Sequence, residues 1–366
     1  MGSVFGESSP LQGTSADPPG GSPLYPKPRW YAPVAVKARP FIAAATVLFL
    51  AWFTMKFHMD NANDSETRAY VGTLLWNVEH ATLSTDGTGH YTGVAPYVVW
   101  QFSGVLSLLT DLYATRGLAL ALTCLGVALY GLAYAWFAEL GLRWPTRLLG
   151  LALLSVSVVF ALLLRGWELD KLIEPSLFLL GALLAWRGQY MGFALVAAVA
   201  AANRESGAFM PLVALAALAQ QRGSLRAALG TWPVWLAAAL SLAAVLPLRS
   251  QLPPPPVRPF ADLSLERLIY VAGGLCLLPV LAFAWRITPT RGLGVLLYVL
   301  SPVWLLFVLA TDRLEQGALL LAPLALVWLP ATLLGLEQVA RPRQPESVAI
   351  PAAPAARQSA PVAPGT

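Results

Sequence analysis

Ten long apolar runs recur along this chain, and they limit its possible folds more than any other feature. Their bounds are Phe41–Phe57, Gly117–Leu140, Leu148–Leu164, Pro175–Trp186, Met191–Ala202, Gly207–Ala219, Trp232–Leu248, Leu268–Trp285, Leu293–Ala310 and Ala318–Leu336. The chain is 57% hydrophobic and 12% charged, whereas a soluble domain is about 45–50% apolar and about 25% charged. We therefore expect an all-α fold, that of a polytopic integral membrane protein with about ten transmembrane helices. The runs that start at Pro175, Met191 and Gly207 are shorter than the roughly 17–25 residues that usually span, so they tilt, extend into their polar flanks or pair as half-helices.

The polar ends of the chain set the expected domain bounds. Residues 1–37 form a tail rich in Gly, Pro and Ser, residues 38–338 the transmembrane domain, and residues 339–366 a tail rich in Pro and Ala. Both tails are predicted to be disordered cytoplasmic segments, because they carry no apolar period. Basic residues precede the first apolar run: Lys27, Arg29, Lys37 and Arg39. Since excess Lys and Arg mark cytoplasmic connections, the net charge of +5 points to topology and not to a nucleic-acid partner.

The charges between the apolar runs change sign from one connection to the next. Arginines without acids occupy four connections, at Arg143 and Arg147, at Arg187, at Arg222 and Arg226, and at Arg286 and Arg291, and the C-terminal tail starts with Arg341 and Arg343. Acids occupy the others, at Glu168, Asp170 and Glu174, at Glu205, at Asp262 and Glu266, and at Asp312 and Glu315. This segregation obeys the positive-inside rule only if Tyr97–Leu112 does not cross the membrane. We therefore expect both termini inside and Tyr97–Leu112 as an outer-surface or re-entrant helix.

The segment 58–116 is then a long first outer loop that carries surface helices. Its acids are Asp60, Asp64, Glu66, Glu79 and Asp86. Residues Glu66–Leu83 fit an amphipathic helix, because Tyr70, Leu74, Leu75 and Val78 fall near one face. His90 and Tyr91 follow later in the loop, either lining a substrate site or lying on the surface.

A short charged motif, Asn203-Arg204-Glu205-Ser206, separates two apolar runs. A charge at the bilayer centre costs roughly 2.5–3.5 kcal/mol, so the motif is either a polar turn at the membrane surface or a site with a use. In the structural alternative, Asn203 and Ser206 cap the helix that begins near Gly207, and Arg204 and Glu205 pair with each other or with a neighbour. Glu174 precedes Pro175 and reads as the start of a helix, with the acid beside its positive end.

Three groups of ionisable residues are expected at the same outer membrane level, where they would share one cavity. They are Asp60 and Asp64, then Arg165, Glu168, Asp170 and Lys171, and then Arg204 and Glu205. A carboxylate can act as a general base toward an acceptor hydroxyl, and arginine and lysine can hold a phosphate. A lipid-phosphate sugar would present its headgroup at this level. The competing interpretation is that these acids are solvated surface residues.

Metal and disulfide chemistry are not indicated. The three histidines, His58, His80 and His90, match no zinc spacing. Cys124 and Cys276 both fall inside apolar runs, where small core residues are the better interpretation. No metal ligands and no resident cofactor are therefore assigned, although the sequence does not decide whether a divalent metal is needed.

The order of these features resembles the GT-C superfamily of polytopic glycosyltransferases over roughly residues 38–220. The motifs that resemble a bacterial subgroup are Asp64…Tyr70, His90-Tyr91…Pro96, Asp170…Pro175 and Asn203-Arg204-Glu205-Ser206. That subgroup commonly has Thr where Ser206 stands and an Arg near Pro96 that this chain lacks. The resemblance implies a polyprenyl-phosphate sugar donor, a cell-envelope glycan, lipid or protein acceptor, and a bacterial inner membrane.

Combined with the chemistry above, the resemblance gives each candidate a role. Asp64 is the first choice for the general base and Asp60 the second. Glu168 and Asp170 would shape the acceptor site, Arg165, Lys171 and Arg204 would hold the phosphate, and Glu205 would orient Arg204. The rival functions are a transporter or flippase for lipid-linked glycans, a polysaccharide polymerase or ligase, and a non-catalytic protein of the same fold.

Overall fold

A computed structural model describes seven segments of the chain: residues 31–61, 64–80, 93–110, 114–163, 169–251, 290–310 and 320–340. Every regular element in these segments is helical, and they contain no strand, which confirms the all-α prediction. Both predicted tails and the apolar run Leu268–Trp285 fall mostly or wholly outside the described residues. The chain divides into two compact units, Met1–Phe41 and Ile42–Thr366. The first contributes only the opening turns of α1, and all contacts discussed below lie within the second.

The helices follow the predicted apolar runs closely. In chain order they are α1 (Tyr31–Asn61), α2 (Asp64–Glu79), α3 (Ala95–Thr110), α4 (Ala114–Glu139), α5 (Trp144–Leu163), α6 (Asp170–Trp186), α7 (Tyr190–Asn203), the 3-10 helix η1 (Glu205–Phe209), α8 (Met210–Arg222), α9 (Leu225–Leu229), α10 (Trp232–Ser250), α13 (Arg291–Val295), the π-helix η2 (Leu296–Leu300), α14 (Ser301–Ala310), α15 (Leu321–Pro323), the π-helix η4 (Leu324–Trp328) and α16 (Leu329–Ala340). The surface helix expected at Glu66–Leu83 is α2, and the helix expected at Tyr97–Leu112 is α3.

Among the described residues, four helices are long and apolar enough to cross a membrane: Lys37–Asp60, Arg116–Glu139, Trp232–Ser250 and Leu321–Ala340. The membrane-protein prediction is supported at this level, whereas the count of ten spans stays a prediction. The structure has fewer candidate spans than the sequence predicts because several of its apolar helices are short. The 14 residues of α7 and the 13 of α8 extend only about 20 Å at 1.5 Å per residue, against a hydrocarbon core of about 30 Å.

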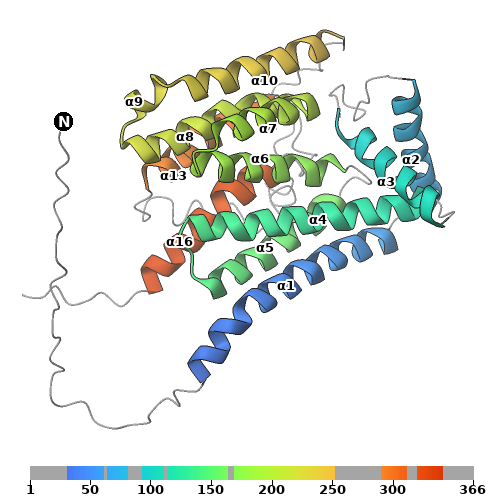
Figure 1. Ribbon diagram of the computed structural model, residues 1–366, viewed down its shortest axis with the longest axis horizontal. Coiled ribbons are helices and arrows are strands. Elements are labelled where there is room, and N and C mark those ends of the chain that lie inside the picture. Colours follow the sequence, from blue (N-terminus) through green and yellow to red (C-terminus); the bar gives the residue numbers. More distant parts are fainter. Residues whose placement is uncertain are drawn as a thin grey trace, which may run out of the picture. The chain divides into compact units, whose positions relative to one another are not determined.

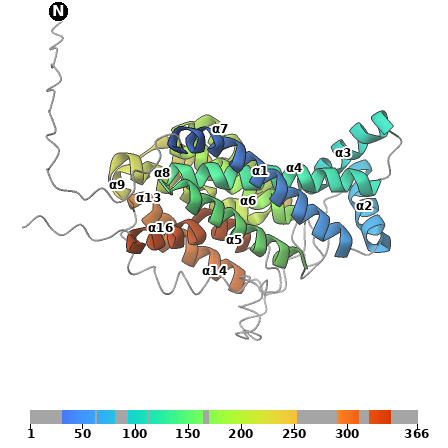
Figure 2. The same ribbon diagram turned by 90° about the horizontal axis from the view of Figure 1, so that it is seen from below.

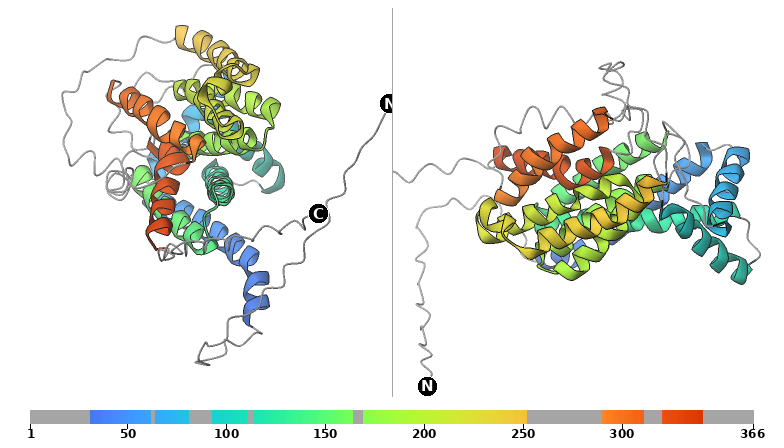
Figure 3. Two further views of the ribbon diagram at one scale, coloured as in Figure 1. Left: turned by 90° about the vertical axis from the view of Figure 1, so that its left-hand side faces the viewer. Right: turned by 90° about the horizontal axis from the view of Figure 1, so that it is seen from above.

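Helices α4, α6, α7, α8 and α10 pack side by side, with α2 and α3 at one end of the group (Figure 1). The view from above shows α10 and α8 running alongside α7 (Figure 3). Helix α1 crosses α4 obliquely (Figure 2), at a point where a Cβ added to Gly126 would lie 3.1 Å from the Cβ of Ala51. The Thr54 and Tyr130 hydroxyls, 2.7 Å apart and buried, join the same two helices. Small residues at the crossing let the two backbones approach closely.

Two tryptophans satisfy polar groups along the π-helical segments near the C-terminus. The indole Nε1 of Trp136 on α4 donates to the carbonyl of Leu326 in η4 at 2.8 Å. The indole of Trp328 donates to the hydroxyl of Ser301 at 3.0 Å, joining η4 to the helix that follows η2. Both rings are buried, so each bond removes a donor that would otherwise be unpaired inside the protein.

The connections between helices collect at two opposite ends of the bundle. At one end Arg187 pairs with Glu139 at 2.5 Å, and the amide of Arg143 donates to Glu337 at 2.8 Å. At the other end the contacts described in the next subsection join α2, α6, α7 and α10. Among the described residues, the connection that bears Arg187 and the junction of α7 with η1 that bears Glu205 therefore lie at opposite ends of the bundle.

Candidate functional site

The motif that separates two apolar runs forms a sharp break between helices. Helix α7 ends at Asn203, Arg204 adopts an extended backbone, and η1 begins at Glu205. A Cβ added to Gly207 would lie 2.2 Å from the amide nitrogen of Ala201 and 2.3 Å from the carbonyl carbon of Ala200. Only glycine therefore lets η1 fold back against the last turn of α7. Because the chain reverses here, the Arg204 side chain points into the protein interior.

Arg204 is fully buried and lies against an acid on a different helix. Its Nη1 atom is 3.7 Å from Oε2 of Glu174 on α6, and the hydroxyl of Ser206 donates to Oε1 of the same carboxylate. We call these three side chains the buried ionic cluster. Burial penalises each charge strongly, and the opposite charge and the hydroxyl of Ser206 help to offset that cost. The cluster therefore ties η1 to α6.

The structure corrects two expectations about the helix boundaries near the buried ionic cluster. Helix α6 begins at Asp170 and contains Pro175, so Glu174 does not mark a helix start at Pro175. Helix α8 begins at Met210 and has no side-chain cap, so Asn203 and Ser206 do not cap a helix beginning near Gly207. The reason is that the chain forms a 3-10 turn first, and Ser206 uses its hydroxyl on Glu174.

Glu205, expected to orient Arg204, has a cation from α10 beside it. Its Oε1 lies 3.3 Å from Nη1 of Arg249, and the side chains are 12% and 22% exposed. Sequence reasoning did not single out Arg249. The signal was present, since Arg249 is a basic residue at the end of an apolar run on the side of the pattern that otherwise favours acids.

The first outer loop meets this end of the bundle at two points. The amide of Leu169 donates to the hydroxyl of Tyr70 on α2 at 3.2 Å. The amide of Gly93 donates to the carbonyl of Asn203 at 3.1 Å, and a Cβ on Gly93 would lie 2.1 Å from the carbonyl oxygen of Ala202. The loop, the start of α6 and the end of α7 are thus brought together.

Of the remaining candidate residues, the structure describes the side chains of some and not of others. Asp60 is exposed and pairs with Lys56 at 2.5 Å, one helical turn away, which is a solvated arrangement. Lys171 is buried one turn before Glu174 on α6. Its positive charge interacts electrostatically with His58 on α1. Asp64 and Asp170 begin α2 and α6, but their side chains lie outside the described part of the structure. Arg165, Glu168, His90 and Tyr91 also lie outside it.

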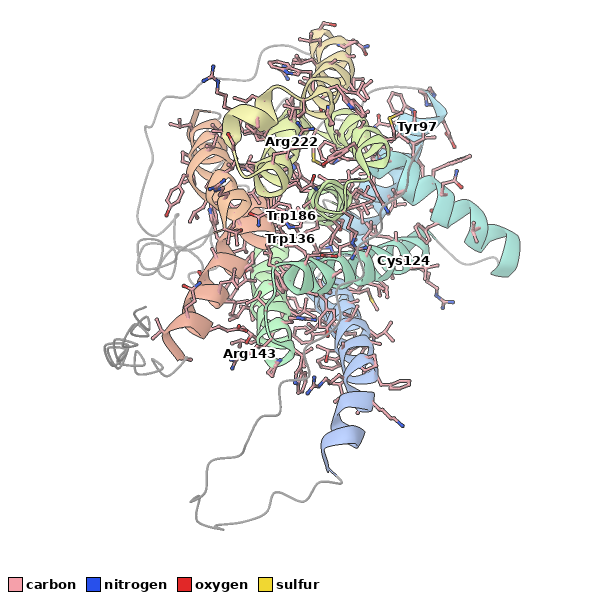
Figure 4. All side chains as sticks on the ribbon, turned by 60° about the vertical axis from the view of Figure 1, so that its left-hand side comes forward. Tyr97, Cys124, Trp136, Arg143, Trp186 and Arg222 are labelled. Atoms are coloured by element: carbon pink, nitrogen blue, oxygen red, sulfur yellow. The ribbon has the colours of Figure 1, made fainter. Side chains whose placement is uncertain are left out.

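Within the described segments no group of three His, Cys, Asp or Glu residues is placed to hold a metal ion. Cys124 is exposed on α4 (Figure 4), so its expected place in the core is wrong. The helix carries it on the outward face, where an apolar residue in a membrane helix contacts lipid. Cys276 lies outside the described residues.

Comparisons with known proteins give no relative for this chain. No family model matches the sequence, and no curated protein or solved structure is significantly similar to it. The chemistry of the site is therefore argued from its own residues and from their arrangement.

Proposed function

We propose that this chain is a GT-C-like membrane glycosyltransferase that moves a sugar from a polyprenyl-phosphate donor to a cell-envelope glycan, lipid or protein. The observation that carries the proposal is a pair of hydrogen bonds at the first loop, from the Leu169 amide to the Tyr70 hydroxyl and from the Gly93 amide to the Asn203 carbonyl. They hold together the motifs on which the resemblance rests, although these motifs are up to 130 residues or so apart in the sequence. A site built from one loop and two helix ends suits a substrate with its tail in the bilayer and its headgroup outside.

In the proposed reaction Asp64 is the general base. Its carboxylate accepts the proton of the acceptor hydroxyl, and the freed oxygen forms a bond to the anomeric carbon. The bond between that carbon and the donor phosphate breaks, and the lipid phosphate leaves with the electron pair. The sugar is transferred with inversion. Asp64 is preferred to Asp60, because Asp60 is already neutralised by Lys56 at the surface.

The phosphate contacts are assigned by accessibility. Arg204 is enclosed with Glu174, so we give it a positioning role, in which it holds η1 and α6 in place. We assign the phosphate contacts to Arg165 and to Arg249, which is partly exposed beside Glu205. Lys171 would add positive charge from its buried position. Glu168 and Asp170 are proposed to line the acceptor side.

The proposed setting is a bacterial inner membrane crossed ten times, with both termini cytoplasmic and the site on the outer face. The short helices α6, α7 and α8 would reach the membrane boundaries through their polar flanks and by local thinning of the bilayer. The arginine-bearing connections then face the cytoplasm, in keeping with the positive-inside rule.

The test uses the full-length chain in lipid nanodiscs with a panel of radiolabelled polyprenyl-phosphate hexoses and pentoses and an envelope lipid extract as acceptor. Wild-type protein is expected to transfer label, Asp64→Asn to lose at least about 100-fold of the rate, and Asp60→Asn to keep most of it. Full activity in Asp64→Asn overturns the role of Asp64. Movement of the intact donor between leaflets, without transfer to acceptor, replaces the proposal with a lipid-glycan transporter.

A further inference from the structure

Three exposed arginines gather at the end of the bundle opposite the buried ionic cluster. Arg222 is the last residue of α8, Arg226 lies in α9, and Arg291 is the first residue of α13. The side chain of Arg291 lies over the turn between α8 and α9, because a Cβ added to Gly223 would come within 2.8 Å of its Nη1. We call these three residues the arginine cluster.

The packing of α13 on α8 fixes this arrangement. The amide of Gly292 donates to Oε1 of Gln220 at 3.0 Å. A Cβ on Gly292 would lie 2.5 Å from the Trp186 ring and 2.8 Å from the carbonyl oxygen of Ala216. The absence of a side chain at Gly292 therefore lets α13 begin against the last turns of α8. Arg291 is brought to the same turn as Arg222 by this close contact.

No acid neutralises the arginine cluster within the described segments of the chain. None of its three members is in an ion pair there, whereas Arg187 at the same end pairs with Glu139 at 2.5 Å. Like charges held at one turn repel each other, and a shared anion removes that repulsion. Guanidinium groups bind phosphate oxygens in bidentate fashion, so a phosphate is the anion that fits best.

Exposed apolar side chains adjoin the arginine cluster. Leu225 and Leu229 on α9 are exposed, and Trp232 and Trp235 on α10 are 58% and 62% exposed. Both indoles are held in place: Trp232 meets the Tyr190 ring edge-on, and Nε1 of Trp235 donates to the carbonyl of Leu229 at 2.9 Å. Trp232 is also the first residue of a helix long enough to cross a membrane. Tryptophan at this position is typical of the membrane–water interface.

We infer that the arginine cluster and the adjoining face of α9 and α10 bind an anionic phospholipid of the leaflet at this end. The guanidinium groups take the headgroup phosphate, and the leucines and tryptophans contact the start of the acyl chains. The apolar half of the surface distinguishes a lipid from a soluble phosphate, which has nothing to bury there. This site lies away from the proposed transfer site and does not depend on glycosyl transfer.

The experiment compares two double variants of the full-length chain that lose the same charge. Arg222→Gln/Arg226→Gln removes two members of the arginine cluster. Arg143→Gln/Arg187→Gln is the control at the same end, and Figure 4 shows Arg143 on a different helix connection from Arg222. Each protein is placed in nanodiscs of phosphatidylcholine with a minor share of phosphatidylglycerol. The retained lipid is measured by native mass spectrometry after release, once thermal melting in pure phosphatidylcholine has shown equal folding.

Wild type and control are expected to retain phosphatidylglycerol in preference to phosphatidylcholine. The Arg222/Arg226 variant is expected to lose roughly 25-fold of that preference, since each arginine near an anionic surface contributes about fivefold. An unchanged preference for phosphatidylglycerol in this variant overturns the inference. An equal loss in the control also overturns it, because it would show only a general electrostatic attraction to the positive charge at this end. Inorganic phosphate at millimolar concentration is expected not to displace the lipid. Displacement would instead indicate a soluble anion site.

Discussion

Nη1 of Arg204 lies 3.7 Å from Oε2 of Glu174, and the two side chains are 1% and 2% exposed. The residues come from α7–η1 and α6, so their attraction joins elements that meet only in the folded protein. A buried pair of this kind is expensive to break from one side, because removing either partner takes the opposite charge away from a group that stays inside the protein. The pair is therefore a positioning device for the end of the bundle where the first loop is attached.

The first prediction concerns this pair. Arg204→Met and Glu174→Met are each expected to lower the free energy of unfolding by about 3–5 kcal/mol, because each removes the opposite charge from a group that stays buried. The double variant Arg204→Met/Glu174→Met is expected to cost less than either single change. Denaturant unfolding of the purified protein in detergent measures all three. Costs that simply add across the double variant would show that the two side chains are energetically independent.

The second prediction concerns the turn that buries Arg204. Gly207→Ala places a Cβ 2.2 Å from the Ala201 nitrogen, and this contact is with backbone that cannot move aside alone. We expect loss of folded protein, or a thermal midpoint lower by several degrees. Gly131→Ala on α4 is the matched control, because a Cβ there meets nothing within 4 Å and alanine is the better helix former by about 1 kcal/mol. Equal midpoints in the two variants would contradict the close approach.

The third prediction contrasts the second ion pair with the first. Glu205 and Arg249 are partly exposed, so water screens their attraction. Arg249→Gln is expected to lower the free energy of unfolding by about 1 kcal/mol or less, and added salt should shrink the difference from wild type. The same denaturant unfolding at low and high salt measures it. A loss as large as that of Arg204→Met would mean that Arg249 belongs to the buried ionic cluster.

Helix positions were predictable from the sequence, because hydropathy and periodicity act over whole segments. The apolar run Gly117–Leu140 became α4, and the amphipathic pattern at Glu66–Leu83 became α2. Helix starts were less predictable. Proline at position 175 suggested a first helical residue, yet α6 already runs from Asp170, because tertiary packing tolerates the single backbone bond that proline removes.

The ionic partner of each charged residue at the site could not be predicted from the sequence, and the reason is physical. Charges adjacent in sequence, such as Arg204 and Glu205, point to different elements once the backbone between them is extended. The acid that Arg204 contacts is Glu174, 30 residues earlier, and the packing of the two elements brings it there. Charge alternation predicts that the polar motifs lie at one membrane level, which stays a prediction, whereas the particular contacts depend on helix packing.

The fourth prediction tests the attachment of the first loop. Tyr70→Phe removes the acceptor of the Leu169 amide, so that amide loses its bond and α2 loses a tie to α6. Hydrogen exchange at residues 169–171 is expected to quicken about fivefold, equivalent to about 1 kcal/mol. Tyr97→Phe is the control, since Tyr97 is an exposed tyrosine on α3. Unchanged exchange after Tyr70→Phe would show that the loop is held elsewhere.

The fifth prediction concerns orientation in the membrane. The connections bearing Arg187 and Arg222 lie at one end of the bundle, and Ser250 and the junction of α7 with η1 lie at the other. In a chain whose native cysteines, Cys124 and Cys276, are replaced by serine, Arg187→Cys is expected to react with a membrane-impermeant maleimide only after cells are opened. Ser250→Cys is expected to react in intact cells. Arg187 is exposed, so losing its ion pair with Glu139 should cost little stability. Labelling of Arg187→Cys from outside would invert the orientation, move the buried ionic cluster to the cytoplasmic side and remove the basis for an outer-face lipid-phosphate donor.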